Sequence, residues 1–298
     1  MEFRLYFCLF TFYFCLMKFW QTSRRKIPIE KTLVMAILNV TPDSFSDGGK
    51  FVSIEAALKQ AEKLVEEGAD ILDIGGESTR PNSQRVSIEE EIKRIVPVIE
   101  EIAKRFNVPI SVDTSKAEVA EKAINAGAEI INDISGLRWD ERIAEIASDL
   151  NTGLVLMHLR GDFATMHKQK PVEDILREVT NGFHWSINKS ESSGVKKENI
   201  VLDVGIGFSK TFEQNLEIIA KLDTLCQEFI DFPILVGASR KSFIGKILGD
   251  VPVTERLHGT LAANAIAIWN GAKILRVHDV KETVETLKVI QALKTLHS

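Results

Sequence analysis

Cysteine is scarce in this chain. Its 298 residues include only three cysteines, Cys8, Cys15 and Cys226, and no two of them form a C-x-x-C pair. Three such residues exclude a disulfide-built scaffold and a zinc site with four cysteine ligands. This usage is typical of the reducing cytoplasm, which is the location that we predict.

An excess of positive charge is also missing. The formal net charge is −5 and the sequence pI is about 5.8, whereas proteins that bind phosphate backbones gather lysine and arginine. We therefore predict small-molecule partners and no nucleic acid. The chain also has no H-E-x-x-H metal motif, no G-x-S-x-G nucleophile turn and no complete dinucleotide or phosphate loop. These absences exclude several common classes of hydrolase, dehydrogenase and nucleotide-binding protein.

The first 20 residues differ in composition from the rest, because they hold both tyrosines and six of the 16 phenylalanines. The apolar run from Leu5 to Met17 is shorter than the roughly 20 residues of a membrane span. It also lacks the basic start and the cleavage site of a secretory signal. One interpretation is a weak anchor followed by basic residues. We prefer another, in which translation starts at Met17, residues 1–16 are a mis-assigned extension, and the folded domain occupies residues 17–298 without a membrane.

Short apolar runs alternate with longer amphipathic stretches from Lys31 onward. Eight runs predict strands: Leu33–Leu38, Ile71–Ile74, Ile110–Val112, Ile130–Ile131, Leu154–Met157, Ile200–Leu202, Ile234–Val236 and Ile274–Val277. The longer stretches predict helices, among them Ile54–Glu67, Ile88–Phe106, Lys116–Ala126, Phe212–Phe229, Phe243–Leu248, Thr254–Asn270 and Val280–Leu296. Eight repeated units predict an α/β protein with one domain, a single (β/α)8 TIM barrel, which needs about 250 residues.

A short internal repeat indicates where the chemistry lies. Gly-Ala, a charged residue and two aliphatic residues open three predicted strands, beginning at Gly68, Gly127 and Gly271. Five positions after each glycine stands a polar residue: Asp73, Asn132 and Arg276. Glycine suits the left-handed end of a helix. The polar positions fall at the carboxyl ends of strands, where TIM barrels build their active sites.

Polar side chains follow most of the predicted strands and divide into two groups by chemistry. One group offers hydrogen-bond acceptors, an amide and a donor, which suits a flat heterocycle: Asp113, Asn132, Asp203 and Lys241. The other suits a pyrophosphate and its metal: Asn39, Arg80, Arg276 and His278.

Simpler interpretations stay open for three of these segments. Residues 113–115 and 239–242 could cap the helices that follow them. The helix start at Ser242 could also hold a substrate carboxylate on its free backbone N–H groups. His158 is most simply a hydrogen-bonded histidine of the core.

Two long segments resemble the signatures of the dihydropteroate synthase family. They are Leu38–Gly49 and Asp73–Pro81, and the similarity continues at 111–116, 239–242 and 276–280. The resemblance covers residues 17–296. It implies a transferase of folate synthesis that condenses 6-hydroxymethyl-7,8-dihydropterin pyrophosphate with p-aminobenzoate to give 7,8-dihydropteroate and pyrophosphate. It further implies Mg²⁺ as cofactor, a homodimer, and a sulfonamide target.

The resemblance also implies roles for individual residues. The pterin set is Asp113, Asn132, Asp203, Phe208, Lys241 and Arg276. The pyrophosphate set is Asn39, Thr79, Arg80, Arg276 and His278, with Asn39 at the Mg²⁺. The p-aminobenzoate set is Phe45, Pro81, Lys241 and Ser242, the first two on loops that close over the ligand. The catalytic set is Asp113, Lys241, Arg276 and Asn39.

The chain departs from the family pattern after the sixth predicted strand. Where the family has Asp-Pro-Gly-x-Gly-Phe-Gly-Lys, residues 203–210 read Asp-Val-Gly-Ile-Gly-Phe-Ser-Lys. Asp203 and Lys210 are retained as ligand-bearing residues. Val204 loosens a turn whose φ proline would fix, and we expect Ser209 to avoid any backbone angle that only glycine tolerates.

Two rival functions stay open. One is a pterin-binding methyltransferase barrel, which would not need Arg80, Arg276 and His278 together with the first signature loop. The other is an inactive paralogue that binds a pterin or a protein partner without catalysis.

Overall fold

The structure is a computed structural model that describes residues 17–40, 50–81 and 83–297. Eight parallel strands form a closed barrel in the order β10-β3-β4-β5-β6-β7-β8-β9. Their bounds are β3 (Leu33–Asn39), β4 (Ile71–Gly75), β5 (Ile110–Asp113), β6 (Ile130–Asp133), β7 (Gly153–Met157), β8 (Ile200–Asp203), β9 (Ile234–Val236) and β10 (Ile274–Val277). All eight predicted strands and the single TIM barrel are confirmed.

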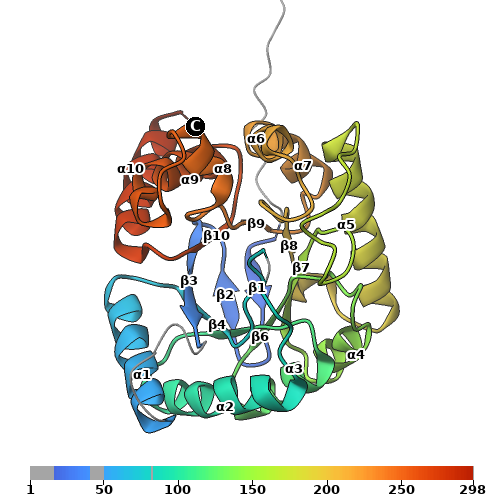
Figure 1. Ribbon diagram of the computed structural model, residues 1–298, viewed down its shortest axis with the longest axis vertical. Coiled ribbons are helices and arrows are strands. Elements are labelled where there is room, and N and C mark those ends of the chain that lie inside the picture. Colours follow the sequence, from blue (N-terminus) through green and yellow to red (C-terminus); the bar gives the residue numbers. More distant parts are fainter. Residues whose placement is uncertain (1–16, 41–49, 82, 298) are drawn as a thin grey trace, which may run out of the picture.

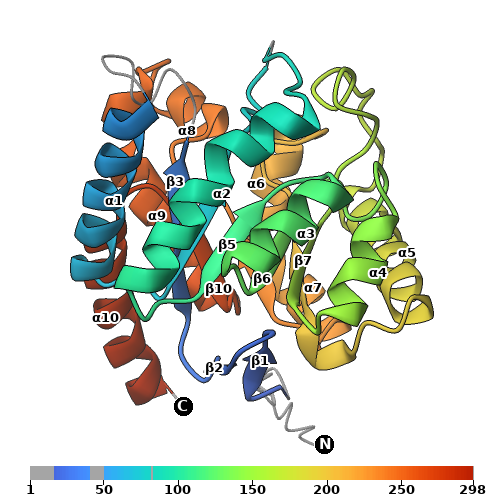
Figure 2. The same cartoon turned by 90° about the horizontal axis from the view of Figure 1, so that it is seen from below.

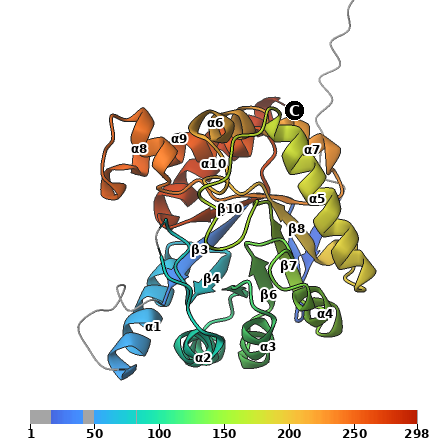
Figure 3. The same cartoon turned by 45° about the vertical axis from the view of Figure 1, so that its right-hand side comes forward.

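Helices surround the barrel on its outside (Figures 1 and 3). They are α1 (Lys50–Glu66), α2 (Ile88–Arg105), α3 (Ala117–Ala126), α4 (Arg142–Asp149), α5 (Ile175–Ser192), α6 (Phe212–Ala220), α7 (Leu222–Glu228), α8 (Ser242–Ile247), α9 (Leu257–Trp269) and α10 (Val280–His297). Short 3₁₀ turns lie at Lys197–Asn199 and Val253–Glu255. None of the helices in the described ranges has the length and apolarity that crossing a membrane requires.

Three predicted helices have clearly different bounds in the structure. The helix predicted from Ile54 starts earlier, at Lys50. The prediction of one helix from Phe212 to Phe229 is wrong. Two helices lie there, and Lys221 is both the C-cap of α6 and the N-cap of α7. The change of direction at Lys221 buries Leu222 and Leu225 of α7 together with Ile218 of α6. The predicted helix from Thr254 starts later, at Leu257, because residues 253–255 form a 3₁₀ turn.

Alternate residues of each strand face the helices or the barrel interior, as the pleat of a strand requires. Val34, Ala36 and Leu38 of β3 pack into the main core between strands and helices. Residues of the opposite face form a second buried cluster inside the barrel: Leu33, Met35, Ile71, Ile130, Val155, Val201, Leu235 and Ile274. The amino-terminal half of the barrel is therefore filled with aliphatic side chains, and only the carboxyl half is left for a site.

An antiparallel hairpin that the sequence did not predict covers the amino-terminal end of the barrel (Figure 2). It consists of β1 (Phe19–Gln21) and β2 (Lys26–Pro28), and it packs Trp20 and Ile27 onto the interior cluster. Trp20 is fully buried, and its Nε1 donates a hydrogen bond to the carbonyl of Asn199 at 2.8 Å. A Cβ atom on Gly153 would lie 3.2 Å from the Trp20 ring, so a larger residue at the start of β7 would crowd it.

The packing of Trp20 predicts a large stability effect without an effect on ligands. We expect Trp20→Ala to lower the free energy of unfolding by about 3–5 kcal/mol, because the truncation leaves a cavity against the interior cluster. Trp20→Phe should cost less, since a ring still fills most of the space. Guanidinium unfolding of the three proteins provides the comparison. A loss of less than about 1 kcal/mol for the alanine variant would mean that the hairpin is not part of the cooperative fold.

Candidate active site

The three polar residues of the internal repeat meet inside the carboxyl half of the barrel. Asp73, Asn132 and Arg276 each follow an interior isoleucine of the aliphatic cluster by two positions, so the alternation of each strand places them in the layer above it. Arg276 Nε donates to Asp73 Oδ2 at 2.6 Å. Asn132 Nδ2 donates to the same oxygen at 3.2 Å. Three strands that are far apart in sequence are thus joined through one carboxylate oxygen.

Arg276 holds a second carboxylate at the same time. Its Nη2 donates to Asp113 Oδ2 at 2.6 Å, so the guanidinium bridges Asp73 on β4 and Asp113 on β5. Burial raises the pKa of Asp113 to about 7; Arg276 opposes this shift and the charge of Asp73 reinforces it. Burial alone would lower the pKa of Arg276, but the two carboxylates raise it above its usual range. The cation is therefore permanent, and Asp113 titrates near neutral pH.

A second group lies beside this one at the ends of β8 and β9. Asp203 Oδ1 accepts a hydrogen bond from the Gly205 N–H at 2.8 Å, which leaves its other oxygen for a ligand. Lys241 Nζ lies 4.5 Å from the centroid of the Phe208 ring and donates to the Ile206 carbonyl. Burial raises the pKa of Asp203, opposed by Lys241, and burial lowers the pKa of Lys241 to about 8. All six residues of the predicted pterin set lie in these two groups.

Asn39, the last residue of β3, faces the ion pair across Gly75. A Cβ atom on Gly75 would lie 3.8 Å from Asn39 Oδ1 and 3.7 Å from Asp113 Oδ2. In the described part of the chain no hydrogen bond engages the Asn39 amide. No cluster of three or more His, Cys, Asp or Glu side chains within the described ranges could hold a metal ion. A single amide oxygen nevertheless fits Mg²⁺, which completes its shell with water and substrate phosphate oxygens.

His278 is held as a neutral donor. Its backbone N–H donates to Ser239 Oγ at 3.2 Å, and Ser239 Oγ lies 3.0 Å from His278 Nδ1. Because this hydroxyl oxygen already accepts the backbone N–H, its own proton can go to Nδ1, which leaves the ring proton on Nε2. Burial, reinforced by the positive charges of Arg276 and Arg240, lowers the pKa of His278 to about 4. The free Nε2–H can therefore serve an anion without adding a charge.

The remaining predicted residues lie at the rim. Arg80, Pro81 and Ser242 are exposed and Thr79 is half-buried. Among the residues that the structure describes, no hydrogen bond joins the side chains of these four to the buried groups. Phe45, together with the rest of residues 41–49 of the first signature, lies outside the described residues.

Asp73 is the residue that the sequence analysis did not assign to the site. Its side chain is fully buried, and its Oδ1 has no hydrogen-bond partner within the described ranges. The signal was present, because Asp73 occupies the same position of the internal repeat as Asn132 and Arg276.

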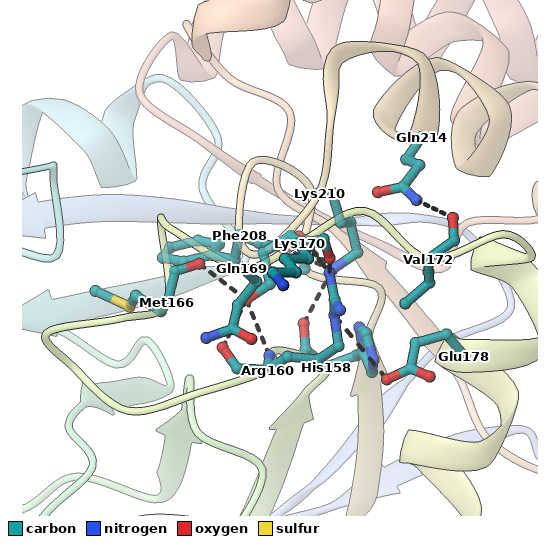
Figure 4. A network of polar contacts seen from close by, with 12 residues as sticks. His158, Arg160, Met166, Gln169, Lys170, Val172, Glu178, Phe208, Lys210 and Gln214 are labelled. Carbon is teal, nitrogen blue, oxygen red and sulfur yellow. Dashed lines mark hydrogen bonds and ion pairs between the residues drawn. The ribbon is translucent and has the colours of Figure 1, made fainter.

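Lys210 was predicted to bear ligand contacts, and in the structure its side chain contacts backbone carbonyls. Its Nζ donates to the carbonyls of His158, Gly205 and Phe208 at 3.1, 2.9 and 3.0 Å (Figure 4). Burial lowers the pKa of Lys210 to about 7, although Asp203 opposes the shift. Through these three carbonyl oxygens, Lys210 fixes the turn after β8.

Ser209 adopts the left-handed backbone that glycine favours, with φ of 55°, but this is not an angle that only glycine tolerates, since Leu137 and Arg240 have similar values. This angle costs a residue with a side chain about 1–2 kcal/mol. The Ser209 hydroxyl offsets the cost, because it accepts from the Arg160 N–H at 2.9 Å and lies 2.8 and 3.0 Å from the carbonyl oxygens of Arg160 and Met166. Val204 is fully buried and packs into the main core. Packing thus fixes the turn where proline would otherwise do so.

Neither polar run caps its helix with a side chain at the N-cap position, so the simpler interpretation of both runs is not supported. The N-cap residue of α3 is Lys116 and that of α8 is Lys241, both without a side-chain cap. Asp140 Oδ2 instead accepts the Ala117 N–H at 2.9 Å. Asp113 points inward to Arg276 instead. His158 is a buried core residue as predicted, but its Nδ1 has no hydrogen-bond partner among the residues described.

The closed barrel and the polar layer at the carboxyl ends of its strands are the arrangement of TIM-barrel enzymes. Residues 35–278 match the family described as "Pterin binding enzyme". The chain is 47% identical over 264 residues to the dihydropteroate synthase of Bacillus subtilis, covering 89% of each. It is 48% identical over 261 residues to that of Escherichia coli K12, covering 87% of this chain and 90% of the relative. The chain therefore belongs to the pterin-binding enzymes, and among them to the dihydropteroate synthase family.

Solved structures agree with this assignment. The Xanthomonas albilineans dihydropteroate synthase with 4-aminobenzoic acid has a TM-score of 0.86 and 41% identity, covering 93% of this chain and 98% of that one. The Coxiella burnetii dihydropteroate synthase in complex with pteroic acid has a TM-score of 0.83 and 36% identity, covering 94% and 100%.

The raised pKa of Asp113 predicts a pH-dependent stability. In the ligand-free fold this pKa is raised from 3.8 to about 7, so the folded chain retains a proton that the unfolded chain releases. Wild-type stability therefore falls as pH rises between these values. Relative to wild type, Asp113→Asn should gain at least about 1 kcal/mol over this window. Urea unfolding of both proteins near both ends of the window measures the gain, and a constant difference would mean that folding does not raise the pKa of Asp113.

Proposed function

We propose that this chain catalyses the condensation of 6-hydroxymethyl-7,8-dihydropterin pyrophosphate with p-aminobenzoate, giving 7,8-dihydropteroate and pyrophosphate. The observation that carries the proposal is the buried layer in which acceptors, an amide and two cations face one interior space. Its support also comes from the relatives, which are dihydropteroate synthases, and from their structures with 4-aminobenzoic acid and pteroic acid.

The pterin ring needs partners for both its donor and its acceptor edge. The free oxygen of Asp203 and the Asn132 carbonyl oxygen can accept its N–H groups, because the other polar atom of each side chain is already engaged. Lys241 supplies a donor, while Phe208 and Arg276 flank the ring. Asp113, which accepts a hydrogen bond from Arg276, is the remaining residue of the pterin set.

The pyrophosphate group requires positive charge and neutral donors. Arg276 and the Nε2–H of His278 come from β10 and the segment after it, and Arg80 and Thr79 come from the segment after β4. Asn39 would hold Mg²⁺, which neutralises charge on the departing pyrophosphate when it is bound. These groups stabilise the negative charge that develops on the leaving oxygen.

No protein nucleophile is required for the reaction. The bond between the pterin methylene carbon and the pyrophosphate oxygen breaks, and its electron pair leaves with pyrophosphate. The amine nitrogen of p-aminobenzoate then bonds to that carbon and releases one proton. The site holds the two reactants together. Lys241 and Ser242 are the proposed partners of p-aminobenzoate, with Pro81 and Phe45 covering it so that water does not take the place of the amine.

A steady-state assay tests the proposed reaction. Pyrophosphate release from the pterin substrate should depend on p-aminobenzoate, and the product should be dihydropteroate. Pterin binding without any such release would contradict the proposal and favour an inactive paralogue or a methyltransferase barrel.

We further propose that the chain forms a homodimer through α9 and α10. Four apolar side chains on these two contacting helices are exposed: Ile266 (50%), Trp269 (44%), Val289 (61%) and Leu293 (54%). Apolar surface of this kind marks interfaces. Light scattering should give twice the chain mass for wild type and the chain mass for Leu293→Glu. A monomeric wild type would contradict the proposal.

The predicted cytoplasmic location rests on the cysteine content.

Replacing Asp203 tests the proposed pterin site. In Asp203→Asn, an amide N–H group would face an N–H group of the pterin in place of the carboxylate oxygen. This should weaken pterin binding by about 1–3 kcal/mol. Titration calorimetry with 6-hydroxymethylpterin measures the loss. Asp231→Asn is the control, because the Asp231 side chain is 42% exposed and pairs with Lys197. Equal affinity in wild type and Asp203→Asn would remove Asp203 from the pterin site.

Replacing Arg80 tests an ordered reaction. If the p-aminobenzoate site is completed only when pyrophosphate is bound, pterin, pyrophosphate and Mg²⁺ together should strengthen p-aminobenzoate binding by about 1–3 kcal/mol. Arg80→Ala should remove most of this gain, since the segment loses its link to the phosphate. Arg105→Ala, at an exposed pair with Glu101 on α2, is the control. Titrations that give the same p-aminobenzoate affinity with and without the other ligands would show a preformed site.

A further inference from the structure

One histidine contacts both ligand regions proposed above. His167 lies in the segment between β7 and α5 and is half-buried. Its Nε2 lies 2.8 Å from the carbonyl oxygen of Thr79. Its ring stacks on Phe208, with the centroids 5.7 Å apart and the planes inclined by 28°. Since a carbonyl only accepts, Nε2 must carry the proton and donate it to Thr79.

The segment that carries His167 is fixed before the histidine to the turn after β8, and after the histidine to α6. Arg160 Nη2 donates to the carbonyls of Ser209 and Lys170 at 2.7 and 2.9 Å. Gln214 Nε2 donates to the Val172 carbonyl at 2.7 Å (Figure 4). His167 is therefore presented from a rigid support, next to the Phe208 side chain that belongs to the same turn.

The segment that carries Arg80 has few other attachments. Glu77, at its start, is fixed by an ion pair with buried Lys116 at 2.9 Å. Beyond Glu77, the bond from His167 is the only hydrogen bond that ties residues 78–81 to a distant part of the described chain. The remaining bonds of Arg80, to Ser78 and Ser83, are local. The position of exposed Arg80 thus depends on His167.

We propose that His167 is a positioning residue that couples the pterin subsite to the pyrophosphate subsite. Its ring contacts Phe208 at the pterin, and its Nε2–H fixes Thr79 and Arg80 at the pyrophosphate. A pterin packed on Phe208 restricts the His167 ring and so orders the phosphate-binding segment before pyrophosphate binds. This inference rests on the proposed roles of Phe208 and Arg80.

Two variants separate the two contacts of His167. H167F keeps a ring to stack on Phe208 but has no donor, and H167Q keeps an N–H donor but has no ring. H184A is the control, because His184 is an exposed residue of α5 that pairs with Glu228 at 3.5 Å. Calorimetry would measure the affinity for 6-hydroxymethylpterin alone, and for pyrophosphate with Mg²⁺ in the presence and absence of the pterin.

The proposal predicts a selective loss. H167F should bind the pterin within about two-fold of wild type, yet bind pyrophosphate about three- to ten-fold more weakly when the pterin is present, as expected for one lost hydrogen bond. The KM for the pterin pyrophosphate should rise with it. H167Q should retain pyrophosphate affinity better than H167F but lose the enhancement by the pterin. H184A should match wild type throughout.

Two results would overturn the inference. One is an unchanged pyrophosphate affinity and coupling in both His167 variants. The other is an equal loss of pterin and pyrophosphate affinity in H167F, which a merely structural role would produce. Thermal unfolding would verify that each variant is folded. Because these titrations need no p-aminobenzoate, they are independent of turnover: a wild type without p-aminobenzoate-dependent pyrophosphate release would contradict the proposed function instead.

Discussion

The ion pairs of Arg276 with Asp73 and Asp113 are the interaction on which the rest of the site depends. Two carboxylates lie in one buried layer, and without the guanidinium between them their charges would repel each other in a poorly solvated space. The 2.6 Å contacts fix both carboxylates, and Asp73 in turn fixes Asn132. Buried ion pairs contribute little net stability, because desolvation offsets their attraction. Ligand positioning therefore explains the network better than stability does.

The barrel separates stability from chemistry along each strand. On β4, Ile71 and Asp73 both point into the barrel interior. Asp73 lies two positions further along the strand, nearer the carboxyl end of the barrel. The aliphatic layer at the amino-terminal side is buried and apolar, and the hairpin with Trp20 covers it. The upper layer contains Asp113, Asp203 and Lys241, whose pKa values burial shifts. It also contains Asp73 Oδ1, which has no hydrogen-bond partner among the described residues. Such groups are costly to bury, and the packed lower layer offsets their cost.

Much of this arrangement is visible in the sequence, and the parts that are not have physical reasons. Buried parallel strands form continuous apolar runs, which is why all eight strands were predicted. The hairpin was not predicted, because Trp20 and Ile27 belong to no repeated pattern. The backbone contacts of Lys210 were not predicted for a different reason, since its carbonyl partners come together only once the turn is folded. His167 leaves no local signal either, because Thr79 and Phe208 approach it only in three dimensions.

A double-mutant cycle on Asp73 and Arg276 tests the central claim most directly, namely that Asp73 acts on ligand binding through the side chain of Arg276 that it holds. Titration calorimetry would give the 6-hydroxymethylpterin affinity of wild type, Asp73→Asn, Arg276→Gln and the double variant. If the ion pair organises the site, each single change weakens binding, and the double variant loses less than the sum by an interaction energy of about 0.5–3 kcal/mol. Losses that simply add would mean that Asp73 and Arg276 act independently, and would contradict the account.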